Sequence, residues 1–190
     1  QILGQVGVAG GQQPIENEDG SLVLICNGEV YNYRELAKDL RARGHQFRTA
    51  SDIEVLAHAY DEWGLDFLDK LDGMFALALW DGAARRLVLA RDRMGEKPLY
   101  YARSGDLFLF ASELTSLLQH PEFDSELDYE ALSEYLALEY VAAPRTILRD
   151  AHKLEPGCAL VLENGEHRHI RYWAIDPARR LDISYHDAVD

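Results

Sequence analysis

Three pairs of apolar runs, each pair separated by a short glycine-containing turn, are the feature that most limits how this chain can fold. The turns are Asp81-Gly82, Ser104-Gly105-Asp106 and Asn164-Gly165, and the runs beside them are 74–80 with 86–91, 99–102 with 107–111, and 158–163 with 167–173. Two apolar runs joined by such a turn predict a β-hairpin. Because a hairpin joins antiparallel strands, we expect mainly antiparallel sheets, which argues against a βαβ nucleotide-binding fold.

Apolar residues at helical spacing predict helices that cover these sheets. The predicted elements are a buried strand over 21–27 and helices over 31–43, from Ser51 onward, 65–70, 112–119 and 129–138. Gly44 is a stop signal for the first helix, and Asp128 is a predicted cap for the last. Ser51 and Glu54 match a capping box at the start of the second helix. The predicted fold class is therefore α+β.

Charge and cysteine usage exclude several classes of function. The chain carries 33 acidic and 19 basic residues, a net charge of −14 that argues against a nucleic-acid or acidic-membrane partner. No apolar run approaches the roughly 20 residues of a membrane-spanning helix. The two cysteines, Cys26 and Cys158, lie in strand-like apolar runs. We expect free buried thiols in a reducing compartment and no disulfide.

Two short segments carry residues suited to chemistry. In Asn27-Gly28-Glu29, glycine permits close approach of a ligand, the asparagine amide can donate to an oxyanion, and the glutamate can hold an ammonium group. A plain turn is the interpretation that these residues alone favour. Asp52 lies at a predicted helix start, where a carboxylate either interacts with the helix dipole or binds a substrate amine. Spacing alone does not decide between these alternatives.

Longer motifs favour the functional interpretation. The segment NGEVYNYRELAKDLRARGHQFRTASDIEVLAHAYDEWG is followed in order by GMFALALWD, ARDRMGEKPLYYA, LFASEL and KLEPG. This series resembles the class II glutamine amidotransferase domain of asparagine synthetases, and the likeness covers residues 9–173. The resemblance implies an N-terminal-nucleophile fold, a four-layer αββα sandwich that is incomplete here at its N-terminus. Residues 1–173 would be the partial amidotransferase domain, and 174–190 a linker with the start of a synthetase domain.

The resemblance also implies site residues and partners. Asn27 and Gly28 match the family's oxyanion hole, and Glu29 and Asp52, with them, match its glutamine-binding residues. This domain would need no cofactor or metal. A C-terminal synthetase domain in cis would use ATP and Mg²⁺ to amidate aspartate with the ammonia released from glutamine. A homodimer is a further expected partner, and the expected location is the cytoplasm.

This sequence departs from the family at its beginning. The family nucleophile is an N-terminal cysteine, whereas this chain begins with Gln1, and Cys26 and Cys158 are mid-chain. The family's carboxylate-binding arginine aligns near Ile2, so residues 1–8 receive no role. We therefore expect the chain alone to be inactive. Two alternatives stay open: an amidotransferase of a peptide, antibiotic or polysaccharide pathway, and a degenerate, non-catalytic binding or scaffold domain.

Overall fold

A computed structural model describes residues 12–178 of the chain, and its elements follow the sequence in hairpins and short helices. The strands are β1 (Ile15–Glu16), β2 (Leu22–Val30), β3 (Gly73–Asp81), β4 (Arg86–Arg91), β5 (Tyr100–Ser104), β6 (Leu107–Ala111), β7 (Ala151–Lys153), β8 (Cys158–Glu163) and β9 (Glu166–Arg171). The helices are α1 (Tyr33–Ala42), α2 (Glu54–Trp63), the 3-10 helix η1 (Gly64–Asp66), α3 (Phe67–Lys70), α4 (Leu114–Leu117) and α5 (Tyr129–Leu138). None of these helices has the length and apolar character that crossing a membrane requires.

The strands form two sheets in which all pairings are antiparallel. One sheet has six strands in the order β1-β2-β3-β4-β8-β9, and the other has three in the order β6-β5-β7. The three predicted hairpins are β3–β4, β5–β6 and β8–β9, and all three are confirmed. The α+β class expected from them is confirmed as well.

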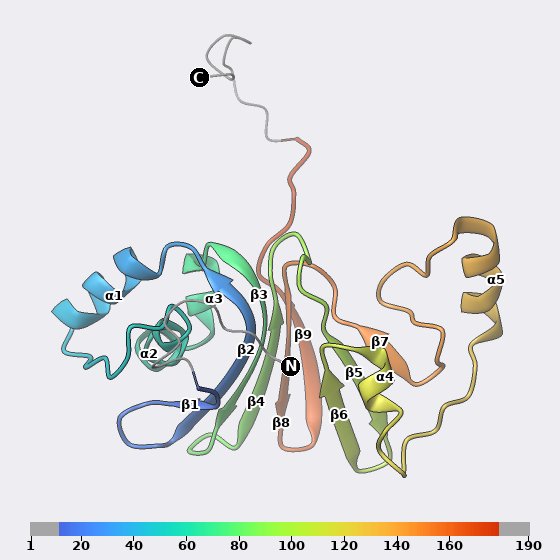
Figure 1. The fold of residues 1–190 in the computed structure, drawn as a ribbon, viewed down its shortest axis with the longest axis horizontal. Helices are drawn as coiled ribbons and strands as arrows, with labels where there is room; N and C mark the ends of the chain where they lie inside the picture. Colours follow the sequence, from blue (N-terminus) through green and yellow to red (C-terminus); the bar gives the residue numbers. More distant parts are fainter. Residues whose placement is uncertain (1–11, 179–190) are drawn as a thin grey trace, which may run out of the picture.

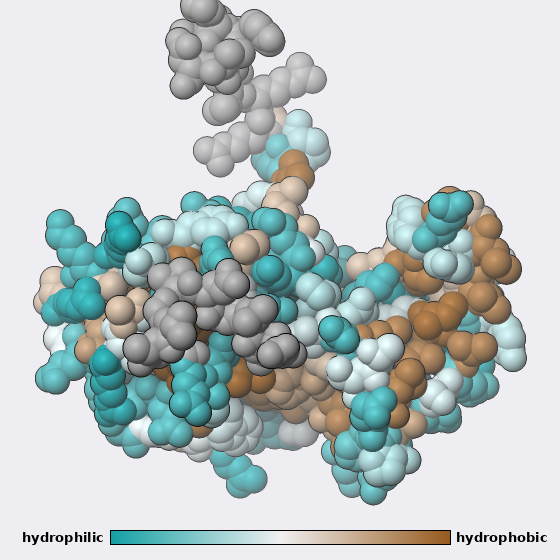
Figure 2. Space-filling model, in the orientation of Figure 1, coloured by the Kyte–Doolittle hydropathy of each residue, from teal (hydrophilic) through white to brown (hydrophobic). Residues whose placement is uncertain are grey.

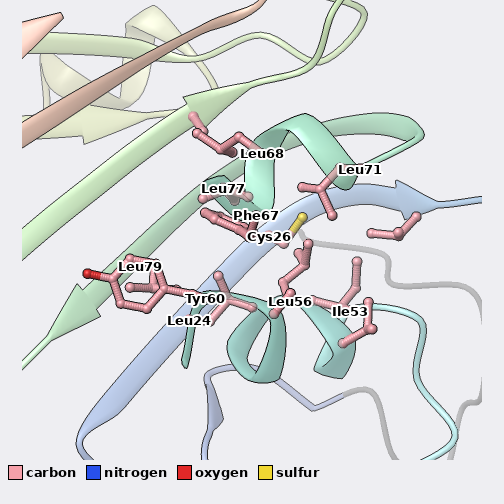
Figure 3. Packing of buried hydrophobic residues seen from close by; sticks show 14 of the residues in the cluster. Leu24, Cys26, Ile53, Leu56, Tyr60, Phe67, Leu68, Leu71, Leu77 and Leu79 are labelled. Atoms are coloured by element: carbon pink, nitrogen blue, oxygen red, sulfur yellow. The ribbon is translucent and has the colours of Figure 1, made fainter. Parts of the chain in front are cut away.

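Layers of apolar side chains join the sheets and helices. Helices α1, α2 and α3 cover one face of the six-stranded sheet, and Figure 1 shows them on the opposite side of the molecule from α5. Leu24, Leu56 and Phe67 are central in this layer, which Figure 3 shows from close by. A second cluster, including Leu89 and Tyr101, fills the space between the two sheets.

A third, smaller cluster lies where α4 meets the three-stranded sheet, around Leu117 and Phe123. Helix α5 begins where predicted, because the carboxylate of Asp128 accepts hydrogen bonds from the N–H groups of Glu130 and Ala131 at 2.9 and 3.0 Å. Only Ala131 of this helix is buried. The helix therefore presents most of its surface, including apolar side chains, to solvent.

The end of β2 lies further along the chain than predicted. The sequence places the Asn27-Gly28-Glu29 segment where the strand ends, with a turn as the alternative, but β2 continues through it to Val30. The reason is pairing with β3, in which Asn27, Gly28 and Glu29 lie opposite Ala76, Phe75 and Met74. The site residues are therefore held by a sheet and not by a loop.

Candidate functional site

The backbone N–H and C=O groups of Gly28 are directed away from β3, toward the outer edge of β2. Phe75 lies opposite Gly28, but its N–H and C=O are bonded to Asp92, the N–H to a carboxylate oxygen and the C=O to the Asp92 N–H. In an antiparallel pair, residues opposite each other exchange both backbone bonds or neither. The N–H of Gly28 therefore faces the side of β2 where β1 pairs.

Two side chains occupy the same edge of β2 on either side of Gly28. The Gln13 amide accepts from the N–H of Cys26 at 2.6 Å and donates to its C=O at 2.7 Å, as a neighbouring strand would. Two residues past Gly28, the N–H of Val30 donates to Oδ2 of Asp52 at 2.9 Å. Within residues 12–178, no hydrogen bond to the Gly28 N–H is formed from this side. A backbone donor thus lies between an amide and a carboxylate.

Asn27 faces a cavity between the two sheets. Strand alternation puts its side chain on the same face as Ile25, which packs in the cluster between the sheets. The cavity has a volume of about 200 Å³, and its other walls include Ala76, Phe110 and Ser112. An amide that enters this cavity beside the Gly28 N–H can supply a second hydrogen-bond donor to a ligand oxygen.

Two carboxylates accompany these donors. Glu29 is half-buried and, by alternation, projects to the same face of β2 as Asn27. Asp52 is only 4% exposed, and its bond to Val30 joins it to the end of β2. The structure therefore brings the two segments singled out in the sequence, 27–29 and 52, to one place. The functional roles of these four residues stay predictions.

The loop that carries Asp52 is held differently from what the capping box predicts. Glu54 does not bond to Ser51; its carboxylate accepts from the N–H groups of Arg48 and Thr49 at 2.6 and 2.8 Å and from the Thr49 hydroxyl at 2.5 Å. The Ser51 hydroxyl oxygen accepts instead from the N–H of Ile53 at 3.2 Å. The capping-box prediction is wrong because Glu54 closes the preceding loop, and this arrangement fixes Asp52.

Gly28 is also needed for the close pairing of β2 with β3. Its φ is +151°, and a Cβ at this position would lie 2.0 Å from the carbonyl oxygen of Met74. Gly73 is its counterpart on β3, where a Cβ would lie 2.3 Å from the carbonyl oxygen of Glu29. The space that a side chain would need is filled by the backbone of β3, so close strand pairing requires glycine here.

Neither cysteine is suited to be a nucleophile. Cys26 is 2% exposed and packs with the α1–α3 layer, where Figure 3 shows its sulfur among Leu56, Leu71 and Phe67. Burial raises the pKa of its thiol, and the nearby Asp52 carboxylate raises that pKa further. Burial also raises the pKa of Cys158, which lies between the sheets. The expectation of free buried thiols is confirmed for both residues.

Sequence reasoning selects neither Gln13 nor Asp92 as a site residue, although both shape the site. Gln13 lies in the Gly-Gly-Gln-Gln-Pro stretch, where no local pattern marks its contact with β2. Asp92 is 1% exposed and accepts hydrogen bonds from four backbone N–H groups, those of Phe75, Met94, Glu96 and Lys97. The bond to Phe75 fixes the part of β3 that lies opposite Gly28. The predicted arginine position near Ile2, and residues 1–8, lie outside the described residues.

Comparison with known proteins gives consistent matches. The profile of the glutamine amidotransferase domain matches residues 3–173. Asparagine synthetase [glutamine-hydrolyzing] 3 of Bacillus subtilis is 40% identical over 190 residues, which is 98% of this chain and 31% of that protein. Asparagine synthetase [glutamine-hydrolyzing] 2 of the same organism is 45% identical over 133 residues, 70% of this chain and 18% of that protein.

A solved structure has a similar fold. The glutamine phosphoribosylpyrophosphate amidotransferase of B. subtilis superimposes with a TM-score of 0.57 at 26% identity, covering 85% of this chain and 32% of the other. The chain thus spans less than a third of the length of the curated relatives it matches, and of this solved structure.

Proposed function

The chain belongs to the glutamine amidotransferase domain family, and we propose that residues 1–173 are the glutaminase domain of an asparagine-synthetase-type enzyme. In this proposal the domain hydrolyses free glutamine to glutamate and ammonia. The observation that carries it is the position of the Gly28 N–H, which lies on the edge of β2 between Gln13 and Asp52 and close to the Asn27 side chain. Residues 174–190 would lead to a synthetase domain.

The proposed role of Asn27 and Gly28 is to stabilise an oxyanion. When a thiolate attacks the side-chain amide carbon of glutamine, the carbonyl oxygen becomes negatively charged. The Gly28 N–H and the Asn27 amide are donors from adjacent residues of one rigid strand, so they need little reorganisation to meet that charge. Removing one such donor lowers the rate constant by roughly a hundredfold to a thousandfold.

Glu29 and Asp52 are proposed to bind the α-ammonium group of glutamine. A free amino acid carries this charge, whereas a glutamine within a peptide does not. Two carboxylates at the end of β2 would therefore favour the free amino acid through charge-assisted hydrogen bonds. The second oxygen of Asp52 is suited to this role, since the first is bonded to Val30.

The nucleophile in this proposal is an N-terminal cysteine placed against Asn27 and Gly28, as the family resemblance implies. Its thiolate would form a thioester with the glutamyl group and release ammonia, and water would then release glutamate. Cys26 and Cys158 are excluded by their burial and raised pKa values. Residues 1–190 by themselves are therefore expected to release no ammonia from glutamine.

Ammonia release from free L-glutamine by the full-length protein tests the proposal, with Asn27→Ala as the diagnostic variant. We expect kcat to fall roughly a hundredfold to a thousandfold while the fold is retained. Asn164→Ala, in the β8–β9 turn, is the matched control and should leave kcat unchanged. A full-length protein that neither binds nor hydrolyses glutamine would refute the proposal, as would an Asn27→Ala variant with unchanged kcat.

The synthetase partner is the second element of the proposal. It would bind ATP and Mg²⁺ and amidate aspartate in the cytoplasm, with the acceptors of peptide, antibiotic and polysaccharide pathways as the alternatives to be tested by product analysis. Five exposed apolar side chains support a partner at α5, and together they are named the α5 face: Tyr129, Tyr135, Leu136, Leu138 and Tyr140. In Figure 2 the apolar colour gathers on the side of the molecule where Figure 1 places α5.

A further inference from the structure

Three polar side chains from separate elements meet in the helical layer. Glu18 lies in the turn between β1 and β2, His45 in the loop after α1, and His58 in α2. One potential ligand atom from each residue lies within 4.8 Å of those of the other two. None of the three has a role in the proposed glutaminase reaction.

His58 is the unusual member of this cluster. Its side chain is 2% exposed, and neither ring nitrogen has a hydrogen-bond partner among residues 12–178. The nearest carboxylate oxygens, Glu18 Oε1 and Glu54 Oε1, are both 3.7 Å from a ring nitrogen. A buried polar group without a partner costs about 1–3 kcal/mol, so most such groups in native proteins are satisfied. The His58 ring is an exception to this rule within the part of the chain that the structure describes, and a bound ligand would remove the exception.

Glu54 forms its hydrogen bonds with other donors and lies too far from the ring, at 3.7 Å, to be that partner. Its carboxylate already accepts from Arg48 and Thr49, and these bonds close the loop in front of α2. Glu18 Oε1 faces the other ring nitrogen and also accepts from the N–H of Gln46 at 3.1 Å. The Glu18 side chain is 40% exposed, so it can adjust toward a ligand.

We propose that Glu18, His45 and His58 bind a divalent transition metal, with Zn²⁺ as the preferred ion. Two imidazoles and one carboxylate are typical zinc ligands, whereas Mg²⁺ and Ca²⁺ prefer oxygen ligands throughout. Zinc bonds are about 2.0–2.2 Å long, so the three ligand atoms must lie closer together than the 4.8 Å within which they are found. The partly exposed side chain of Glu18 can move toward the ion. A water molecule would complete a tetrahedral site.

Glu62 supports this assignment from outside the cluster. Its Oε2 lies 3.2 Å from Nε2 of His45, and its Oε1 accepts from Arg43 at 2.9 Å. Imidazoles that bind metals commonly donate their second N–H to a carboxylate, which fixes the ring and its tautomer. The bond to Glu62 leaves the other nitrogen of His45 for the metal.

A metal at this position would add a further link between three segments that side-chain hydrogen bonds already join. It would connect the β1–β2 turn, the loop over residues 43–53 and α2. This loop carries Asp52, so the ion would stabilise the segment that holds the proposed glutamine-binding carboxylate. The site lies in the helical layer beside Phe47 and not at the cavity between the sheets, so the metal would take no part in the proposed glutaminase reaction.

Zinc binding by the untagged full-length protein tests the inference. The protein is stripped with EDTA, incubated with Zn²⁺, desalted and analysed for metal content, and its melting temperature is measured with and without Zn²⁺. We expect about one Zn²⁺ held by this cluster per chain and a higher melting temperature when it is bound. Glu18→Gln and His45→Gln should weaken Zn²⁺ binding by roughly tenfold or more. His120→Gln, outside the cluster, is the matched control and should bind as the wild type does.

Cobalt substitution provides a second measurement if a variant folds poorly. Co²⁺ bound in a tetrahedral nitrogen and oxygen site of the wild-type protein should give visible d–d absorption that Zn²⁺ abolishes. The inference is overturned if the wild-type protein retains no Zn²⁺ and shows no tetrahedral Co²⁺ spectrum. It is also overturned if folded Glu18→Gln and His45→Gln variants bind Zn²⁺ as tightly as the wild type, since the ion would then be bound elsewhere. Glutaminase activity does not enter either readout.

Discussion

The carboxylate of Asp52 accepts a hydrogen bond from the backbone N–H of Val30 at 2.9 Å. This bond joins the loop in front of α2 to the edge of β2, two residues beyond Gly28. Because Asp52 is buried and uses one oxygen for β2, it has a positioning role in addition to its proposed role in binding the glutamine ammonium group. The two roles can be separated by substitution.

Asp52→Asn should weaken glutamine binding while leaving the fold largely intact. The asparagine oxygen can still accept from Val30, but the negative charge that would face the ammonium group is lost. Because hydrogen bonds to charged groups contribute about 1.5–3 kcal/mol, we expect KM for glutamine to rise roughly tenfold to a hundredfold in the full-length protein. Asp106→Asn, in the exposed β5–β6 turn, is the control. An unchanged KM would contradict the binding role.

Gly28→Ala should destabilise the domain by more than its backbone conformation alone explains. The new Cβ would lie 2.0 Å from the Met74 carbonyl oxygen, so β2 and β3 would have to separate. We expect a loss of more than about 2 kcal/mol in the free energy of unfolding, measured by urea denaturation. Gly44→Ala is the matched control, since Gly44 also has a positive φ, +108°, but a Cβ added there would have no atom within 4 Å among the described residues. Equal losses would show that strand contact is not the cause.

The parts of the fold that depend on local chemistry are predictable from the sequence. The three hairpins follow from their turns, and α5 begins directly after Asp128 because an aspartate can bond the free N–H groups of a first helical turn. The continuation of β2 through Gly28 is not predictable in this way, because pairing with β3, which is distant in sequence, decides it.

The site is predictable in its residue types more than in its geometry. The family resemblance selects Asn27, Gly28, Glu29 and Asp52, whereas local patterns alone leave a turn and a helix start as alternatives. The bonds of Gln13 to Cys26 and of Asp92 to Phe75 join residues that are distant in sequence. No periodicity encodes such contacts, so they required the structure.

Asp92→Asn should strongly destabilise the domain, although the two side chains have almost the same shape. Asp92 accepts from four backbone N–H groups, and asparagine replaces one acceptor oxygen by an NH₂ group that faces donors. Each buried donor left without a partner costs about 1–3 kcal/mol, so we expect a loss of at least about 2 kcal/mol in urea denaturation. Asp61→Asn, exposed on α2, should change stability by less than about 0.5 kcal/mol. Similar behaviour of both variants would contradict this role.

Mild acid should destabilise the domain in part through His152. Burial lowers the pKa of this residue in β7, the His167 charge lowers it further, and Asp150 acts in the opposite direction. The unfolded chain therefore takes up the proton at a higher pH than the folded one, and the stability present above the unfolded pKa of 6.5 is lost as pH falls toward the folded pKa. Urea midpoints at about pH 7.5 and about pH 5.5 should differ less in His152→Gln than in the wild type. An identical difference would exclude this contribution.

Leu136→Glu tests whether the α5 face contacts the proposed synthetase domain. Leu136 is 75% exposed, so placing a charge there should change the stability of residues 1–190 by less than about 0.5 kcal/mol. In the full-length protein the same charge would enter an apolar interface and weaken the contact between the domains. Ammonia would then escape, and more glutamate would form for each amide product. Leu118→Glu, 42% exposed after α4 and outside the α5 face, is the matched control. A glutamate-to-amide ratio equal to that of the wild type would place the synthetase domain on another surface.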